Sequence, residues 1–558
     1  MTEFFHRLSR FALPALAFLL SFAGLIRNFE FSTFINLAVP AGLAGMVIFL
    51  MRGTNEKHVG GKALLHPAEA VQQARQKLKA LKEPGFQLWD LLRVPKEYKS
   101  KGIFVMGEQG SGKTLYMLYL IAEALKDPLG KAVIHDYRND VYPFLLEHLK
   151  VPAGQVKLLH PFDKRACGWD VQADLEDEDT AEEIAGAFIE KEEKSVFFYK
   201  SARNIVKAVL TYHLYKSEEN SAFRWRLHHV VEALQSMETI QRLIEAYPSL
   251  RYARDALKNE DVMATVFSGI GKIQTVANLW SWDDKELVSL KAWRRKERPE
   301  LLILGTDPKR QTACEKINTA LWAMVSKQVL DSSAPRLSDM WFFLDEFHAL
   351  GRLEGIETFA STARDYKGNL VLLGQDINQL LKPSMYGREG TNIILQGCST
   401  QIYFRCSGDA SRWASQQIGN QKILKQSTDR RVSGGDVSTG TGEREEKEAL
   451  VMPEDIQQLQ KCSAERPLLD AVITTFLDDP FRYPMTFDAF RHVWATPKIE
   501  RDYQPEGSRE RMKGQQMTQE ERIAFGFDPP QEDTRSGDDN DNTKQTKRRR
   551  LKPKTSRS

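Results

Sequence analysis

Residues 107–114 read Gly-Glu-Gln-Gly-Ser-Gly-Lys-Thr and fit the pattern G-x-x-x-x-G-K-[ST]. In loops of this kind backbone N–H groups surround nucleotide phosphates, the lysine contacts the outer phosphates and the hydroxyl holds Mg²⁺. The pattern predicts a nucleoside triphosphate site, and the lack of an Asn-Lys-x-Asp guanine motif favours ATP over GTP. The predicted phosphate-binding residues are Gly107, Glu108, Gln109, Gly110, Ser111, Gly112, Lys113 and Thr114.

The segments around this loop have the order that such a site requires. Gly102–Met106 is a short apolar run suited to a buried parallel strand, and Thr114–Leu125 carries apolar residues at helical spacing. Further apolar runs at Lys131–Asp136 and Val156–Leu159 continue the alternation. An α/β fold with ligands at the carboxyl ends of a parallel sheet is therefore predicted. A glycine-rich turn without a ligand is the alternative interpretation.

The composition is that of a globular protein with room for two to four domains. Of the 558 residues 27% are charged and 42% are apolar, and the net charge of +3 argues neither for nor against nucleic acid. The five cysteines are odd in number and widely spaced, with no C-x-x-C pair or zinc spacing. This pattern favours reduced thiols in a cytosolic compartment.

Two uncharged segments near the N-terminus predict a transmembrane hairpin. Phe11–Ile26 and Phe31–Met51, with a few flanking residues, are each long enough to cross about 30 Å of hydrocarbon. Basic residues precede the first segment and follow the second, so the positive-inside bias predicts that both termini are cytoplasmic. A cleaved signal peptide is the alternative for the first segment, and the second would then act as a stop-transfer segment.

The predicted organisation has four parts. Residues 1–55 form the hairpin, residues 56–175 and 293–503 form the nucleotide-binding domain, and residues 176–292 form an inserted all-α domain with long helical periodicities. Residues 504–558 are predicted to be a disordered charged tail, because aromatic and aliphatic residues become rare there. The basic run at the end of this tail either binds nucleic acid or anionic partners, or simply keeps the chain soluble.

Two carboxylates follow the apolar strand predicted at Trp341–Leu344. Asp345 is suited to hold Mg²⁺ through its water shell, and Glu346 is suited to orient the attacking water. The alternative is structural, since acidic pairs often follow strands as helix caps, but the glycine-rich loop favours the catalytic interpretation. Farther along, Arg364 could neutralise charge on the transferred phosphoryl group, and Gln375 at the end of the next apolar strand could sense the γ-phosphate. Taken alone, a surface arginine is usually only solvated.

Several of these segments resemble the type IV coupling proteins of bacterial conjugation, the TraD, TraG and TrwB-like ATPases. The segments that carry the resemblance are Leu344–Leu353, Ala363–Tyr366, Gly374–Leu380 and Tyr386–Gly387, while Leu159–Asp163 resembles the TraD branch. The resemblance extends over about residues 87–476 and includes the two N-terminal spans. His348 departs from the proline of many relatives, and residues 136–140 match the family pattern only loosely.

The resemblance implies an inner-membrane ATPase with a RecA-like motor, a helical domain that faces the cytoplasm and a homohexameric assembly around a channel. Proteins of this family couple the relaxase-bound DNA strand to a type IV secretion channel and drive its transfer with ATP. The implied partners are single-stranded and duplex DNA, relaxase and other relaxosome proteins, and components of the channel.

The resemblance also implies a role for each matching residue. Lys113 and Thr114 would bind phosphate and Mg²⁺ respectively, and Asp345 would also hold Mg²⁺. The implied catalytic residues are Lys113, Glu346, Gln375 as sensor, and Arg364, which would reach the nucleotide of a neighbouring subunit.

Two other functions fit parts of the sequence. A membrane receptor or scaffold could recruit protein substrates to a type IV secretion system, with nucleotide acting as an assembly switch. A chromosome-segregation translocase shares the motor and the membrane anchor, but the match through Arg364 and Gln375 and the uninterrupted helical insert argue against it.

Overall fold

The computed structural model describes residues 57–128, 130–191, 196–296, 300–333, 338–433, 436–463, 468–486 and 504–529. The chain divides into two compact units, a smaller one of residues 1–64 and 415–452 and a larger one of residues 65–414 and 453–558. Both predicted membrane spans lie outside the described residues. None of the described helices combines the length and the apolar character that a membrane span needs.

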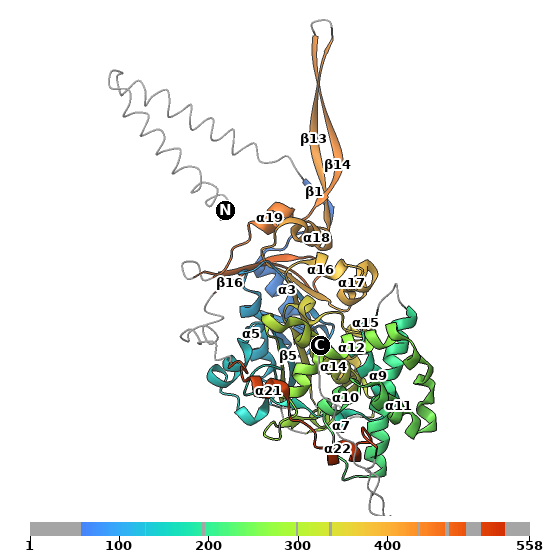
Figure 1. Cartoon of the computed structure of the whole chain (residues 1–558). Helices are drawn as coiled ribbons and strands as arrows, with labels where there is room; N and C mark the ends of the chain where they lie inside the picture. Colours follow the sequence, from blue (N-terminus) through green and yellow to red (C-terminus); the bar gives the residue numbers. More distant parts are fainter. Residues whose placement is uncertain are drawn as a thin grey trace, which may run out of the picture. The chain divides into compact units, whose positions relative to one another are not determined.

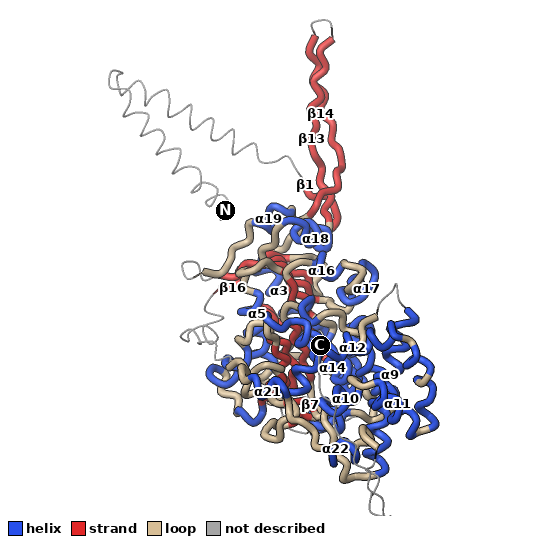
Figure 2. Tube along the Cα trace, viewed as in Figure 1, coloured by secondary structure: helices blue, strands red, loops and turns tan. Residues whose placement is uncertain are grey.

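A nine-stranded sheet forms the centre of the larger unit (Figures 1 and 2). Its order is β16-β15-β12-β4-β11-β10-β5-β9-β6, in which the strands from β12 to β6 run parallel and β15 and β16 pair antiparallel at one edge. The strands are β16 (Phe481–Thr486), β15 (Leu468–Thr474), β12 (Thr400–Tyr403), β4 (Ile103–Met106), β11 (Gly368–Gly374), β10 (Met340–Leu344), β5 (Lys131–Asp136), β9 (Leu301–Gly305) and β6 (Val156–Leu159). The predicted α/β fold is confirmed.

Helices cover both faces of this sheet, which explains why the strands β4 and β10 are apolar at every position. All residues of β4 and β10 are buried. On one face the sheet packs on α5 (Lys113–Ala124) and α3 (Pro67–Leu81). On the other face Phe342 of β10 contacts Trp322 of α14 (Gln311–Leu330) and Phe359 of α15 (Ile356–Thr362).

The helical insert leaves and rejoins the sheet domain at two short paired strands, β7 (Gly168–Trp169) and β8 (Leu287–Val288). The buried carboxylate of Asp174 joins the two ends, because it accepts hydrogen bonds from Trp169 Nε1 and from the backbone N–H groups of Leu290 and Lys291. The helices of this region are α7 (Val171–Asp174), α8 (Glu178–Phe188), α9 (Val196–Glu219), α10 (Leu227–Ala233), α11 (Met237–Ala246), α12 (Glu260–Leu279) and α13 (Leu290–Arg295).

The prediction of a disordered tail from residue 504 is wrong for its first part. Residues 504–529, which we call the C-terminal strap, contain α21 (Arg509–Lys513) and α22 (Gln519–Ala524) and pack on the helical insert. Phe527 is fully buried and Phe525 nearly so, and Tyr212 of α9 donates a hydrogen bond to the Phe525 carbonyl. The prediction failed because the composition was averaged over the whole tail, in which these two buried phenylalanines are a small fraction. Residues 530–558 lie outside the described part of the chain.

The smaller unit contains a three-stranded antiparallel sheet that the sequence analysis did not predict. Its strands are β1 (Lys57–Gly61), β13 (Asn420–Ser433) and β14 (Asp436–Ala449), in the order β1-β13-β14. The last two form a long hairpin and run side by side in Figure 1. In the sequence Gly434 and Gly435 stand between these two strands, and such a pair is a typical hairpin turn signal that polar flanking residues made inconspicuous.

Candidate nucleotide site

The glycine-rich loop lies between β4 and α5, at the carboxyl edge of the parallel strands. Gly110 and Gly112 have positive φ angles of 75° and 102°, which side chains other than glycine rarely adopt. At Gly112 an added Cβ would also lie 2.1 Å from Leu469 Cδ2 of β15, which is two strands from β4 in the sheet. The loop is therefore specified by glycine, and its hydroxyl residue Thr114 is half-buried on the first turn of α5.

Lys113 is buried beneath the loop, with only 4% of its surface exposed. Its Nζ donates a hydrogen bond to the Gly107 carbonyl at 2.7 Å and lies 3.9 Å from Glu346 Oε1. Burial lowers the pKa of Lys113, while the carboxylates of Glu346 and Asp345 act in the opposite direction. A buried ammonium group among carbonyl and carboxylate oxygens is suited to exchange these contacts for phosphate oxygens.

Asp345 and Glu346 follow β10, two strands from β4 in the sheet, and both are almost fully buried. Burial, reinforced by the adjacent Glu346 carboxylate, raises the pKa of Asp345 to about 7. Asp345 Oδ2 and Glu346 Oε2 accept no hydrogen bond within the described residues. Buried carboxylate oxygens without donors fit a site for a hard divalent cation such as Mg²⁺, whose charge would keep Asp345 ionised.

Glu346 adopts a left-handed backbone conformation, with φ at 45°, which is uncommon for a residue with a side chain. This turn directs the carboxylate toward β11, where Gln375 Nε2 donates a hydrogen bond to Glu346 Oε1 at 2.5 Å. Gln375 follows β11, the strand between β4 and β10. The structure therefore brings Lys113, Glu346 and Gln375 together from three adjacent strand ends.

Arg364 lies elsewhere, in the turn Ala363–Tyr366 that precedes β11. Arg364 precedes β11 and Gln375 follows it, and the seven residues of this strand separate them by roughly 23 Å. The two residues therefore lie at opposite ends of the parallel strands. The Arg364 side chain is half-exposed and lines a cavity of about 460 Å³ together with Lys96, Lys99 and Lys367. Arg364 is therefore not part of the candidate nucleotide site of its own chain.

A buried polar network that was not predicted from the sequence lies behind the acidic pair. His135 of β5 lies with Nδ1 2.5 Å from the Asp345 carbonyl and with Nε2 3.0 Å from Thr306 Oγ1. Burial lowers the pKa of His135 to about 4, so the ring is neutral. Asp136 accepts backbone hydrogen bonds from residues 140–142. His135 and Asp136 are the last two residues of the predicted strand Lys131–Asp136. Polar residues at the carboxyl end of a buried strand were the sequence signal that could have indicated this network.

Two further charged residues support the loop from the side of β12. Glu108 lies 3.1 Å from Arg405 Nε and 2.6 Å from Lys461 Nζ. A cavity of about 350 Å³ opens beside the loop and is lined by Glu108, Gln375 and residues 407–410, among others. The site thus has an accessible side between the glycine-rich loop and the end of β11.

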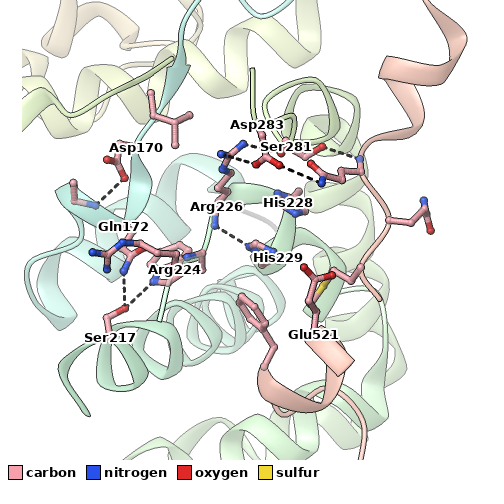
Figure 3. Close-up of a pocket in the computed structure, with 17 residues that line it drawn as sticks. Asp170, Gln172, Ser217, Arg224, Arg226, His228, His229, Ser281, Asp283 and Glu521 are labelled. Atoms are coloured by element: carbon pink, nitrogen blue, oxygen red, sulfur yellow. Dashed lines mark hydrogen bonds and ion pairs between the residues drawn. The ribbon is translucent and has the colours of Figure 1, made fainter. Parts of the chain in front are cut away.

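A larger cavity, of about 700 Å³, lies between the helical insert and the C-terminal strap (Figure 3). Arg226 crosses it and donates hydrogen bonds to the carbonyls of Ser281 and Trp282. His228 is buried in its wall, and its Nδ1 has no hydrogen-bond partner among the described residues. This cavity contains none of the predicted nucleotide-site residues.

Comparisons with known proteins agree on one family. The family model described as "Type IV secretion-system coupling protein DNA-binding domain" matches residues 91–472, more than half of the chain. The coupling protein TraD of Escherichia coli (strain K12) is 22% identical over 317 residues, which are 54% of this chain and 42% of TraD. The protein VirD4 of Agrobacterium fabrum is 31% identical over 91 residues, 16% of this chain and 13% of VirD4.

Solved structures of the conjugative coupling protein TrwB share the fold. The unbound form of TrwBdeltaN70 aligns with a TM-score of 0.60 at 15% identity and covers 77% of this chain and 93% of its own. The complex of TrwB with a non-hydrolysable ATP analogue gives the same TM-score at 14% identity, with 77% and 94% covered. This chain spans less than half the length of the curated relatives that it matches.

Proposed function

Because this chain belongs to the family of type IV secretion-system coupling proteins, we propose that it is an inner-membrane ATPase that couples a relaxase–DNA complex to a type IV secretion channel and drives DNA transfer in bacterial conjugation. One structural observation carries the enzymatic part of this proposal. The side chains of Lys113, Glu346 and Gln375 converge at one sheet edge, beside a glycine-rich loop that has backbone groups suited to phosphate.

The binding step assigns the phosphates and Mg²⁺ to the residues around the loop. Lys113 would exchange its bond to the Gly107 carbonyl for oxygens of the outer phosphates. Thr114 and Asp345 would hold Mg²⁺, and the hydrogen-bond-deficient oxygen of Asp345 supports this assignment. When bound with ATP, Mg²⁺ supplies positive charge that offsets the charge on the phosphate oxygens.

The hydrolysis step assigns the water to Glu346. Its carboxylate is buried, held by Gln375 and close to Lys113, and such a group can accept a proton from an attacking water and fix its direction. Gln375 has one amide that already contacts Glu346, so it could report the presence of the γ-phosphate to the acidic residue. Activity would then depend on the contact between these two side chains.

Arg364 extends the proposal to an assembly. Arg364 lies at the amino ends of the parallel strands, whereas the glycine-rich loop of the same chain lies at their carboxyl ends. Arg364 could therefore contact a nucleotide only if a second copy placed that nucleotide nearby. Arginines supplied by a neighbouring subunit are an effective way to neutralise phosphoryl charge. We therefore propose a ring, a homohexamer as in the resemblance above, with sites completed between subunits.

The proposed partners follow from the family. They are single-stranded and duplex DNA, relaxosome proteins and channel components, with the membrane hairpin of residues 1–55 as the anchor and both termini cytoplasmic. A ring that encloses DNA would contact mainly its phosphate backbone, so binding would weaken steeply with salt. The DNA and secretion-channel assignments are supported by the family description, and the membrane anchor is supported by the two uncharged segments of the N-terminal sequence.

An ATPase measurement on the full chain, with and without DNA, tests the proposal. We expect DNA to stimulate turnover, and we expect Lys113→Ala and Glu346→Gln to lower it by a factor on the order of 100 or more. Glu389→Gln, an exposed acid on another helix, is the matched control and should retain wild-type turnover. Unchanged turnover in Lys113→Ala would contradict the proposed site.

A mixing experiment tests the shared site. Lys113→Ala and Arg364→Ala chains are each expected to be nearly inactive. In mixed assemblies, Arg364 of a Lys113→Ala subunit would face an intact loop on its neighbour, so part of the activity should return. Arg364→Ala alone with wild-type turnover, or mixtures with no gain, would contradict sites completed between subunits.

The alternative is a receptor or scaffold that recruits protein substrates, with nucleotide as an assembly switch. The cavity beneath the C-terminal strap is the observation that favours it, because a binding function of the helical insert would be located there. A truncation after residue 529 removes the basic tail but leaves the strap. Lost substrate recruitment with intact, DNA-independent ATPase would favour this alternative.

A further inference from the structure

The hairpin of β13 and β14 is much longer than the third strand that supports it. Fourteen residue pairs join the two strands, from Asn420–Ala449 at the base to Ser433–Asp436 at the tip. β1 pairs only with residues 421–424 of β13. Among the described strands, β14 has β13 as its single neighbour, so its whole outer edge and that of residues 425–433 are open.

The outer part of the hairpin has little to stabilise it within one chain. Between Lys425 and Arg444 the only large apolar residues are Val432 and Val437, next to the tip. An isolated two-stranded ribbon is marginally stable in water at best, and a long open edge offers unpaired backbone groups to any compatible strand. A ribbon of this length therefore needs a strand partner outside the described sheet.

The two strands carry opposite net charges. β13 has four basic residues and one acidic residue, a net charge of +3, while β14 has five acidic and two basic residues, a net charge of −3. Near the base some of these charges pair within the hairpin, as Lys422 does with Glu445 at 3.0 Å and Lys425 with Glu446 at 3.2 Å. Farther out Arg430 and Arg431 stand opposite Thr439 and Ser438, which are neutral.

We propose that the hairpins of neighbouring copies join edge to edge, with residues 425–433 of β13 in one copy paired antiparallel to β14 of the next. This inference rests on the proposed assembly of several copies. Pairing β14 with β14 would place two strands of charge −3 together, and pairing β13 with β13 would place two of charge +3 together, so like edges repel. Pairing unlike edges is a head-to-tail contact, and repeated contacts of this kind form a ring when the rotation between neighbouring copies closes.

Charge reversal at positions that pair with neutral residues across the hairpin tests this interface. Arg430→Glu with Arg431→Glu changes β13, and Asp436→Lys with Glu443→Lys changes β14. Each of these four residues pairs with a neutral residue across the hairpin, and the partners of Asp436 and Glu443 are Ser433 and Gln426. Neither double substitution therefore places like charges directly opposite each other within one chain. Arg254→Glu with Lys258→Glu, on the surface of the helical insert, matches the first change in charge and is the control.

Assembly of the full chain in detergent is measured by mass as a function of protein concentration. Each reversal alone should raise the concentration needed for assembly by about tenfold, and the four substitutions together should restore it. The control should assemble as the wild type does. A β13 reversal that assembles normally, or a combination that fails to restore assembly, would overturn the proposal.

Two further readouts separate this inference from the proposed function. ATP affinity measured below the assembly concentration should be unchanged in both reversals, because the glycine-rich loop does not involve the hairpin. Outward N–H groups of β14 should exchange with solvent slowly in the assembly and rapidly in dilute wild-type protein. Equal exchange in the two states would overturn edge pairing, whereas lost ATP affinity in Lys113→Ala alone bears only on the nucleotide site.

Discussion

Glu346 Oε1 lies 3.9 Å from Lys113 Nζ in a setting where both side chains are almost fully buried. The two residues are more than two hundred positions apart in the sequence, and parallel strands on either side of β11 bring them together. Each charge compensates the cost of burying the other, so removing one partner leaves an unpaired charge in a low-dielectric setting. The pair is therefore poised for ligand exchange and sensitive to substitution.

The first prediction concerns the carboxylate of Glu346. Glu346→Gln should bind ATP with nearly wild-type affinity but hydrolyse it about 100-fold more slowly, because the amide cannot accept the proton of the water. Equilibrium binding of a fluorescent ATP analogue and steady-state turnover separate the two effects. A fall in affinity that equals the fall in turnover would assign Glu346 to binding instead.

The second prediction concerns the contact between Gln375 and Glu346. Gln375→Glu would place a second carboxylate against Glu346 and should lower turnover more than Gln375→Ala does, because like charges at this distance oppose ionisation. It should also shift the acidic limb of the pH–rate profile upward, since one carboxyl of the pair would stay protonated to higher pH. If the two variants have identical pH profiles, the contact has no role in turnover.

The third prediction concerns pH and the helical insert. Burial lowers the pKa of His213 and His228 to about 4 and that of His229 to about 2. Histidines in the unfolded chain titrate near 6.5, so the unfolded state binds protons first as the pH falls, and the stability present above pH 6.5 is lost progressively between about pH 6.5 and 4. Each histidine contributes up to about 1.4 kcal/mol per pH unit in this window.

Denaturant unfolding at several pH values between 7.5 and 4.5 measures this dependence. His213→Gln should give a shallower loss of stability with falling pH than the wild type, because glutamine does not titrate and the buried imidazole does. Equal slopes in the two proteins would show that this buried ring does not govern the acid sensitivity.

The fourth prediction concerns the contact of the C-terminal strap with helix α9. Gly526 has a φ of 74°, and a Cβ added there would lie 2.6 Å from the Tyr212 hydroxyl. Gly526→Ala should therefore loosen the strap by roughly 1–3 kcal/mol, through backbone strain and the displaced contact. Gly507→Ala, at a position with no heavy atom within 4 Å of the added Cβ, is the matched control.

Limited proteolysis and hydrogen exchange of residues 504–529 report on this change. We expect faster cleavage and exchange across the strap in Gly526→Ala, together with increased exchange in the part of α9 around Tyr212. Protection equal to that of the Gly507→Ala control would contradict a role of Gly526 in holding the strap.

Local patterns in the sequence were sufficient to predict the glycine-rich loop, its flanking strand and helix, and the position of two carboxylates after the strand Trp341–Leu344. Each depends on residues close together in the chain: glycines that permit positive φ, a lysine at a fixed offset, and apolar runs long enough for one strand. The α/β class follows from their alternation. The same reasoning failed where a segment depends on distant partners, as the strap does on Tyr212 and the long hairpin does on strand pairing.

The chemical groups available to this protein are local properties of its sequence: a glycine-rich loop with its lysine, a pair of acids, an arginine and a glutamine. Which of these groups meet depends on the tertiary fold. The strand order places β11 between β4 and β10, so Gln375 at the carboxyl end of β11 contacts Glu346. Arg364 lies at the other end of β11, far from both residues. Strand order results from long-range hydrogen bonding and burial, and no local pattern encodes it.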